Sequence, residues 1–519
     1  GTPSWSVLRT GKGDLALLAA RDVHMRSAFG VYTAGAPTAL GGGKDAAFNP
    51  GRSAAPGSPS LLGPNLVPGA YDGALANYKA WYPDHGGNLR IEAGRDIIGD
   101  VWSARAESGT PDRDLADHAS AAVGNWLWRQ GTAAAAGVQP TATSWWINFG
   151  TYSAVQEGVN KSPRMVGFTG FGTLGGGNLA IEAGRDAGVR DPMGNALGFL
   201  SAPHSSALVA AVGSTGRVSD GEVHLTGGGD LSLRTGGALN PGLRASSLDT
   251  SGYQQDLDLN GALINLRGNA RVDAARIGGL SAILNSYSSL EPYKVSSAVA
   301  MGGAVVVLGD ATAQLQTRGD LVLGGAADPG RVPVANYTDM LLDNGRHAAG
   351  TSWFSLWTAN TALDLFSAGG SLAPSLAGTM HFSGSNVRPE QIRVVAAMDY
   401  LNYWLYPSRF SAVAASGDIS LPRLEGGTQS TARTTQDVLL LAPSTSGRLD
   451  ILAGGSIFSE KYGLQVTRSG ADVRLPGPFD PAFIATDASG ATVRSNVAVD
   501  ATAASVQASL PLFAFGPNT

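Results

Sequence analysis

Tryptophan clusters are the side chains of this 519-residue sequence that are best suited to bind a ligand. The six candidates are Trp126, Trp128, Trp145, Trp146, Trp353 and Trp357. Exposed indole rings form platforms for sugar rings and anchors for protein partners, so these residues are candidate ligand-binding residues. The alternative is structural, because the same rings could fix large loops onto the rest of the protein or cover the face of a sheet.

Residues 318–320 spell Arg-Gly-Asp, which a host-directed adhesin could use to bind integrins. Gly-Asp followed by an apolar residue also occurs at residues 13–15, 229–231 and 417–419. That shared pattern predicts a strand start rather than a loop tip, and a tripeptide match alone is only a hypothesis.

No catalytic, cofactor or metal site stands out in the sequence. The GxGxxG pattern at residues 170–175 runs into further glycines and a strand, so it lacks the helix N-terminus that binds phosphate. The seven histidines show no HxxxH or HExxH spacing. A carbohydrate-active site would need carboxylates that lie close together. Asp418, Glu425 and Asp437 are expected on adjacent coils, but nothing in their pattern selects them. We expect no cofactor.

Composition excludes several classes of protein. The chain has 36 Lys and Arg against 41 Asp and Glu, a net charge of −5, which argues against a nucleic-acid binder. It has no cysteine, so disulfide scaffolds and thiolate metal sites are excluded. No apolar run approaches the roughly 18 residues of a membrane span.

An internal repeat is the most specific feature of the chain. GGNLRIEAGRDI at residues 86–97 recurs as GGNLAIEAGRDA at residues 176–187. Weaker copies begin at residues 13, 229, 363 and 447, and partial copies begin at residues 319 and 417. Self-similarity of this kind is typical of repeat architectures.

Each copy predicts a turn, a short strand, a second turn and the start of another strand. Leu89, Ile91 and Ala93 alternate with charged residues, so the apolar side chains share one face. A single unit cannot bury that face, whereas stacked units can. We therefore predict an all-β fold, a right-handed parallel β-helix solenoid with extra-helical loop insertions, over residues 1–519.

Arg-Asp pairs follow three of these strands, at residues 21–22, 95–96 and 185–186. They could be interpreted as catalytic acids. Their shared position after the strand favours a structural role instead, in which Asp bonds the backbone and Arg faces solvent or a neighbouring coil.

The copies are unevenly spaced, so some intervals must hold degenerate coils and others insertions. We expect insertions at residues 24–85, 101–174, 190–220 and 330–361, and such insertions usually emerge on one, often binding, face. Short helices are expected at residues 112–129 and 388–404.

The repeat resembles the haemagglutinin-type repeats of filamentous-haemagglutinin-like exoproteins, which are exported by two-partner secretion. The match is close at residues 86–98 and 176–188. The NPNG- and NPNL-type motifs of the family's secretion domain are absent, so the resemblance implies an interior segment of a longer exoprotein. It also implies a protein secreted to the surface of a Gram-negative bacterium, with an outer-membrane secretion partner that acts on a region outside this chain.

We expect a structural and adhesive rod that binds other cells, glycans or matrix through its loop insertions. Self-association into fibres through uncapped ends is a further expectation. The first alternative is a module that captures a carbohydrate, haem or a host receptor. The second is a carbohydrate-active β-helical enzyme, such as a polysaccharide lyase or a glycosidase.

Overall fold

A computed structural model of the chain describes the residues that form its sheets. They are residues 7–25, 30–38, 82–99, 101–102, 123, 126–130, 144–147, 168–188, 204–219, 221–241, 261–278, 303–330, 351–353, 355–374, 405–420, 437–442, 444, 446–458, 464–467, 477–479, 482–486 and 492–495. This part of the chain is all-β and contains no α-helix, which confirms the predicted class. Within it, no helical segment is long and apolar enough to cross a bilayer.

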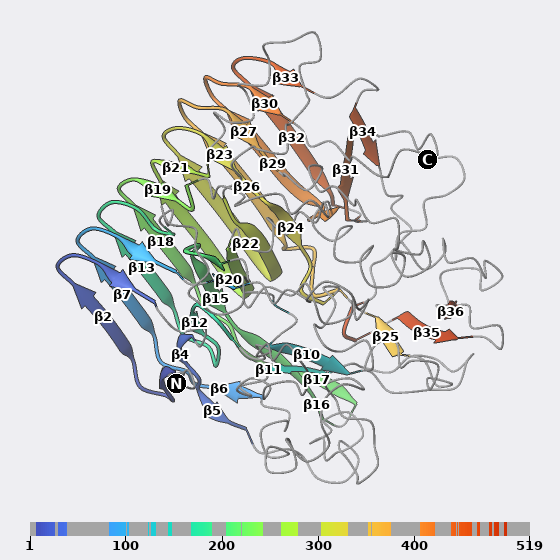
Figure 1. Ribbon diagram of the computed structural model, residues 1–519. Coiled ribbons are helices and arrows are strands. Elements are labelled where there is room, and N and C mark those ends of the chain that lie inside the picture. Colours follow the sequence, from blue (N-terminus) through green and yellow to red (C-terminus); the bar gives the residue numbers. More distant parts are fainter. Residues whose placement is uncertain are drawn as a thin grey trace, which may run out of the picture.

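A long parallel sheet, here called the first sheet, holds the repeated strands side by side (Figure 1). Its strands, in order, are β2 (Leu15–Ala19), β7 (Leu89–Ala93), β13 (Leu179–Ala183), β18 (Leu231–Thr235), β20 (Ala262–Ala274), β22 (Val305–Thr317), β26 (Ala362–Ser367), β29 (Arg409–Ala414) and β32 (Arg448–Ala453). Every neighbouring pair is parallel, so strands far apart in the sequence stack in sequence order.

The register of the first sheet matches the sequence repeat residue for residue. Leu15 pairs with Leu89, which pairs with Leu179, which in turn pairs with Leu231. The long interval after Leu231 holds two degenerate units, which begin at Ala270 and Ala313. The expectation that some intervals conceal weakened copies is therefore confirmed.

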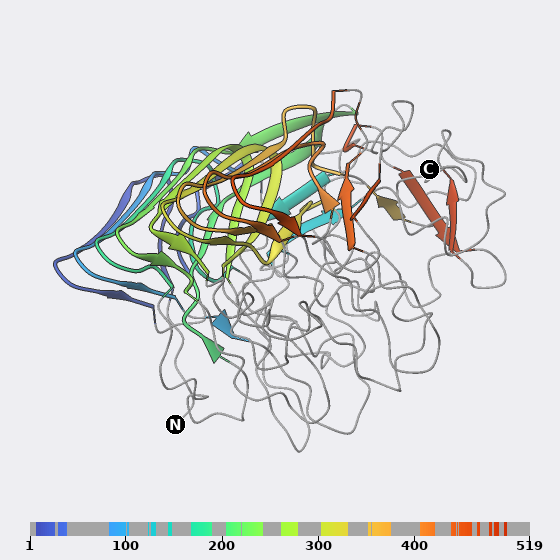
Figure 2. The same ribbon diagram turned by 90° about the horizontal axis from the view of Figure 1, so that it is seen from above.

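A second parallel sheet follows the first across a turn, and these turns nest behind one another along the stack (Figure 2). Its strands are β3 (Val23–His24), β8 (Ile97–Ile98), β19 (Ala238–Leu239), β21 (Arg276–Ile277), β23 (Leu321–Val322), β27 (Leu372–Ala373), β30 (Ile419–Ser420) and β33 (Ile457–Phe458). Ala187 bridges Ile97 to Leu239 and continues the ladder. The partial copies at residues 319 and 417 thus begin second-sheet strands, not first-sheet strands as predicted.

A third set of parallel strands precedes the first sheet in each unit. It comprises β1 (Leu8–Thr10), β4 (Val31–Thr33), β12 (Phe171–Thr173), β15 (Val209–Val212), the first halves of β20 and β22, and β24 (Gly325–Ala327). Strands β28 (Leu405–Tyr406), β31 (Asp437–Leu441) and β34 (Leu464–Thr467) pair separately in the same parallel manner. The sequence missed this set, and three of the stretches predicted as insertions, residues 24–85, 101–174 and 190–220, each contain one of its strands.

Two excursions from the stack begin as antiparallel ribbons. The first is β5 (Ala36–Pro37) with β6 (Pro83–Asp84), and another is β16 (Ser214–Ser219) with β17 (Glu222–Gly227). Both ribbons leave after a third-set strand and return before a first-sheet strand, so they leave the stack at the same corner.

The ribbon β16–β17 belongs to a four-stranded antiparallel sheet, here called the side sheet, beside one end of the first-sheet strands (Figure 1). Its other strands are β10 (Leu127–Gln130) and β11 (Ser144–Ile147). Strand β10 lies where the end of a helix over residues 112–129 was expected, so that expectation is wrong at its C-terminal end. The helix expected at residues 388–404 lies outside the described residues.

Three smaller pairings complete the described strands. Strand β9 (Val101–Trp102) forms an antiparallel pair with β14 (His204–Ser205). Strands β25 (Thr351–Trp353), β35 (Ala482–Thr486) and β36 (Thr492–Ser495) form an antiparallel sheet.

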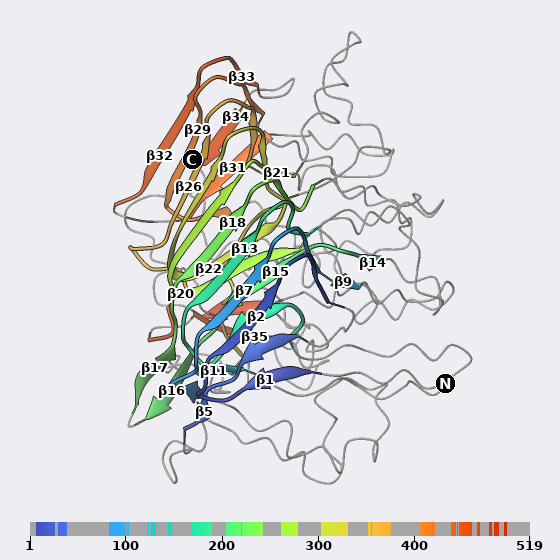
Figure 3. The same ribbon diagram turned by 90° about the vertical axis from the view of Figure 1, so that its left-hand side faces the viewer.

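The core lies between the parallel sheets, because alternate residues of each first-sheet strand point inward. In β13, Leu179, Ile181 and Ala183 are buried while the two residues between them are exposed. The first-sheet strands stand side by side from β2 to β32 in Figure 3 as well, so each inward column is continuous along the stack. This confirms the period-two pattern of the sequence.

Glycine marks the corner ahead of the first-sheet strands that carry the clearest copies of the repeat, where backbones of successive units touch. A Cβ on Gly177, whose φ is +100°, would lie 2.5 Å from the carbonyl oxygen of Gly87. A Cβ on Gly229 would lie 2.2 Å from that of Gly177. Only glycine permits this close stacking, which explains the GGN and GGD patterns of the repeat.

Candidate functional site

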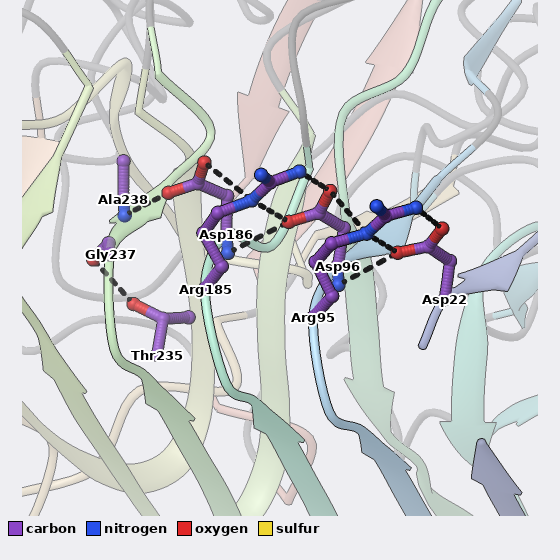
Figure 4. A network of polar contacts seen from close by, with 8 residues as sticks. All are labelled: Asp22, Arg95, Asp96, Arg185, Asp186, Thr235, Gly237 and Ala238. Atoms are coloured by element: carbon purple, nitrogen blue, oxygen red, sulfur yellow. Dashed lines mark hydrogen bonds and ion pairs between the residues drawn. The ribbon is translucent and has the colours of Figure 1, made fainter. Parts of the chain in front are cut away.

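Arginine and aspartate side chains form a ladder between units at the turn from the first sheet to the second (Figure 4). Arg95 Nε donates to Asp22 Oδ1 at 2.7 Å, and the Asp96 backbone N–H donates to the same oxygen at 3.2 Å. Arg185 and the N–H of Asp186 bind Asp96 in the same way, at 2.7 Å and 3.3 Å. In both cases a second guanidinium nitrogen binds the other carboxylate oxygen. Each carboxylate is therefore held by a bidentate arginine and a backbone amide of the next unit.

These contacts keep both carboxylates ionised. The hydrogen bond from Arg95 is the main cause that lowers the pKa of Asp22 to about 2, against an opposing effect of burial. Arg185 lowers the pKa of Asp96 in the same way. A general acid needs a pKa close to its working pH, so this ladder is suited to holding units together.

The aspartate contact continues along the stack after the arginines end. Asp186 Oδ1 accepts from the N–H of Ala238 at 2.6 Å, and Asp418 Oδ1 accepts from the N–H of Ser456 at 2.7 Å. The turn role predicted for the Arg-Asp pairs is confirmed for Asp22, Asp96 and Asp186. The carboxylate of Asp418 is likewise used to bind backbone, while Glu425 and the side chain of Asp437 lie outside the described residues.

A second ladder of side-chain oxygens runs along the corner ahead of the first sheet. Asp14 Oδ1 accepts from the N–H of Asn88 at 2.7 Å, and Asn88 Oδ1 accepts from the N–H of Asn178 at 2.8 Å. The series continues as Asn178 Oδ1 accepts from the N–H of Asp230 at 3.0 Å and Asp230 Oδ1 accepts from the N–H of Asn269 at 3.1 Å. Each Asn or Asp of the repeat thus fixes the position of the following unit.

The Arg-Gly-Asp tripeptide is bound to other units of the stack at each of its residues. Arg318 donates to the carbonyl of Gly236 at 2.8 Å, and Gly319 N–H donates to that of Ala275 at 2.7 Å. Asp320 Oδ1 accepts from the N–H of Ser371 at 2.9 Å. The tripeptide lies at a strand start, as predicted, in the turn that leads into β23.

Three of the candidate tryptophans are buried in or beside the side sheet. Trp126 and Trp146 have no exposed surface, and 4% of Trp145 is exposed. Trp145 Nε1 donates to the carbonyl of Ser214 at 3.2 Å, and the Trp126 ring packs edge-on against Phe168 with centroids 5.5 Å apart. These rings fix the side sheet to the third set of strands, which is the structural alternative stated for them.

Trp357 is also buried, and its Nε1 donates to the carbonyl of Leu308 at 2.7 Å. Trp128 and Trp353 lie on β10 and β25, and their side chains are outside the described residues. The four described indoles present no open ring face, so ligand binding by the six candidates stays a prediction. The structure places Trp128, Trp145 and Trp146 on the side sheet, Trp126 directly before its strand β10, and Trp357 in a different part of the stack.

Asp328 is a buried carboxylate that the sequence did not single out. Its Oδ1 accepts from the N–H groups of Gly330 at 2.9 Å and Leu356 at 3.1 Å, and Ser355 Oγ donates to Oδ2. It ties the end of β24 to the segment that carries Trp357. The sequence Asp-Pro-Gly at residues 328–330 indicates a turn. Nothing in it indicates that Asp328 binds residues as distant in the sequence as Ser355 and Leu356.

The remaining motifs show no site chemistry in the described residues. Of the GxGxxG glycines, Gly170 and Gly175 flank β12 and Gly172 lies within it, and the repeat strand that the sequence predicted after them is β13. No group of three or more metal-ligating side chains occurs within the described ranges. The chain matches no family model, and no curated protein or solved structure is significantly similar to it.

Proposed function

We propose that this chain is a right-handed parallel β-helix that acts as a structural and adhesive rod of a secreted bacterial surface or matrix protein. The observation that carries the proposal is the unbroken in-register pairing from β2 to β32. The chain passes from first to second to third strands and back, which supports a helical path, and parallel crossovers are almost always right-handed.

Stiffness follows from the way each unit is tied to the next. Backbone ladders in the sheets are reinforced by the Arg-Asp and Asn/Asp ladders, which tie the units that carry them to the next unit of the stack. With strands about 4.8 Å apart, the stack from β2 to β32 extends about 40 Å. Such a rod can present binding loops at a distance from the surface that carries it.

Adhesion is assigned to the excursions. The ribbons β5–β6 and β16–β17 leave from the same corner, which supports one binding side. The resemblance of the repeat to filamentous-haemagglutinin-like exoproteins supports export to the cell surface of a Gram-negative bacterium. The partners would be other cells, glycans or matrix.

The test deletes the excursion between β5 and β6, where the two ends of the deleted segment lie next to each other. Thr38 N–H and Oγ1 both donate to the carbonyl of Tyr82, at 3.2 Å and 2.8 Å, so residues 39–81 can be replaced by a short Gly-Asn turn. Beads coated with the whole or the trimmed chain are passed under flow over glycan, matrix and cell surfaces. The proposal expects retention by the whole chain, weaker retention by the trimmed chain and equal unfolding curves. Retention of the whole chain no better than that of an unrelated protein would refute adhesion.

A further inference from the structure

At the outer edge of β2, an arginine and a backbone amide are placed to bind a carboxylate, but no carboxylate of the described strands binds them. The same arrangement binds an aspartate at two places further along the chain. At those places, Arg95 with the amide beside it binds Asp22, and Arg185 with the amide beside it binds Asp96 (Figure 4). Arg21 occupies the equivalent position in the β2 unit. Arg21 is exposed, and its guanidinium has no hydrogen bond or ion pair with any residue of the described part of the chain.

The backbone of this edge has the groups that neighbouring units use for pairing. Where β7 follows β2, Gly94 N–H donates to the carbonyl of Ala19 at 2.9 Å and Arg95 N–H donates to that of Arg21 at 2.8 Å. The equivalent donors of the β2 unit, the N–H groups of Ala20 and Arg21, point to the side where the described strands provide no partner. Edge strands with open donors and acceptors are templates for another strand.

Two further observations show that the edge has room for a strand. Leu15 and Leu17 are only partly buried, whereas their partners Leu89 and Ile91 have no exposed surface. A Cβ added at Gly13 would meet nothing within 4 Å, although one added at Gly87 would lie 2.2 Å from the carbonyl oxygen of Gly13. The side of Gly13 that faces outward is therefore open, whereas the equivalent sides of Gly87, Gly177, Gly229 and Gly268 are covered by the preceding unit.

We propose that this edge binds a parallel β-strand of the chain's own repeat pattern, supplied by a separate polypeptide. The strand that fits carries Asn ahead of its first inward leucine and Asp after its Gly-Arg turn, as residues 88–96 do. Its Asp would bind Arg21 and the amide of Asp22, and its Asn would accept from the amide of Asp14, as Asn88 does from Asn178. The charge of Arg21 complements the carboxylate.

The C-terminal edge of a second copy fits this site less well. Ser456 stands at the position where Asp is needed, and β34 is already paired with β31 beside it. The proposal rests on the pairing of the described strands and does not depend on adhesion by the loops.

The probe is a fluorescent peptide with the sequence of residues 86–98, titrated with the whole chain and followed by anisotropy. Arg21→Gln removes the guanidinium and Gly13→Ala places a methyl group against the incoming strand. Each should weaken binding on the order of tenfold or more. The peptide with Asp96→Asn should lose affinity for the wild-type chain to the same extent and bind Arg21→Gln no differently from the parent peptide.

Matched controls separate this site from unspecific strand pairing. Arg90→Gln changes an exposed arginine on β7, and Gly477→Ala adds a methyl group at a glycine with nothing within 4 Å. Both should bind the peptide as the wild type does. The proposal is overturned if the peptide does not bind, if Arg21→Gln and Gly13→Ala bind it unchanged, or if the chain fills the edge by associating with itself.

Discussion

Asp22 and Asp96 show how one side chain can join two units of a stack. Each accepts two hydrogen bonds from an arginine of the next unit and one from its backbone. The pairing depends on the carboxylates being ionised, so stability at this ladder is linked to pH.

The sign of the pH dependence follows from the lowered pKa values. A carboxyl group whose pKa is lower in the folded protein adds stability above its unfolded pKa of about 3.9 and loses it as the pH falls. For Asp22 this loss extends down to a pKa of about 2. We expect the wild-type chain to lose more stability between about pH 5 and pH 2 than a variant with Asp22→Asn and Asp96→Asn, as measured by urea unfolding.

A comparison between variants is needed because another carboxyl group acts in the opposite direction. Burial raises the pKa of Asp364, so the folded chain binds a proton there more readily than the unfolded chain does. This group therefore favours folding as the pH falls, opposite to Asp22 and Asp96. Glu182→Gln, on the exposed face of β13, is the control and should behave as the wild type does. Equal acid sensitivity of the wild-type chain and the double variant would show that the ladder does not stabilise the fold.

Two glycines at the corner ahead of the first sheet, Gly177 and Gly13, allow a matched comparison. Gly177→Ala forces a methyl group to within 2.5 Å of a backbone oxygen at a φ of +100°, so we expect it to cost more than about 1 kcal/mol. Gly13→Ala is the same change at the equivalent position of β2, where the space is open, and should alter the free energy of unfolding by less than about 0.5 kcal/mol. Equal effects in urea titrations would contradict the stacking of these corners.

The first sheet was predictable because its inward residues repeat with a fixed turn sequence. Leu15, Leu89, Leu179 and Leu231 stand in one column, as the aligned copies indicate. The third set of strands was not predictable, since segments such as Val31–Thr33 and Val209–Val212 share a position but no motif. Burial of the tryptophans could not be decided either, because the same residue types serve exposed platforms and packed interfaces.

We expect the side sheet to depend on its tryptophans. Trp145 is buried between this sheet and the third set of strands, so Trp145→Ala should cost about 3–5 kcal/mol in the unfolding of this region. Leu225→Ala, on β17 of the same sheet with 40% exposure, is the control and should cost less than about 1 kcal/mol. Circular dichroism and thermal unfolding give the comparison, and a small effect of Trp145→Ala would mean that the side sheet is not held by this ring.

The two end strands of the first sheet, β2 and β32, are only partly complementary. Placed end to end, β32 of one copy could pair with β2 of the next, and exposed Arg448 would then face exposed Asp14. Strand β31 precedes β32 as β1 precedes β2, so the second copy's β1 would have to stack on β31. That place is filled, because β34 pairs with β31.

Fibre formation by the whole chain is therefore opposed by β34, although the edges of β32 and β33 are open among the described strands. We expect the whole chain to sediment as a monomer across a wide concentration range. A chain that ends at Phe458 lacks β34, and it should associate end to end in a concentration-dependent way, because heterologous contacts that do not close form open filaments. Gly13→Ala in the shortened chain should suppress this association, since the added methyl group would meet the backbone of the preceding copy. Association of the whole chain, or of the shortened chain irrespective of Gly13→Ala, would show that copies meet through another surface.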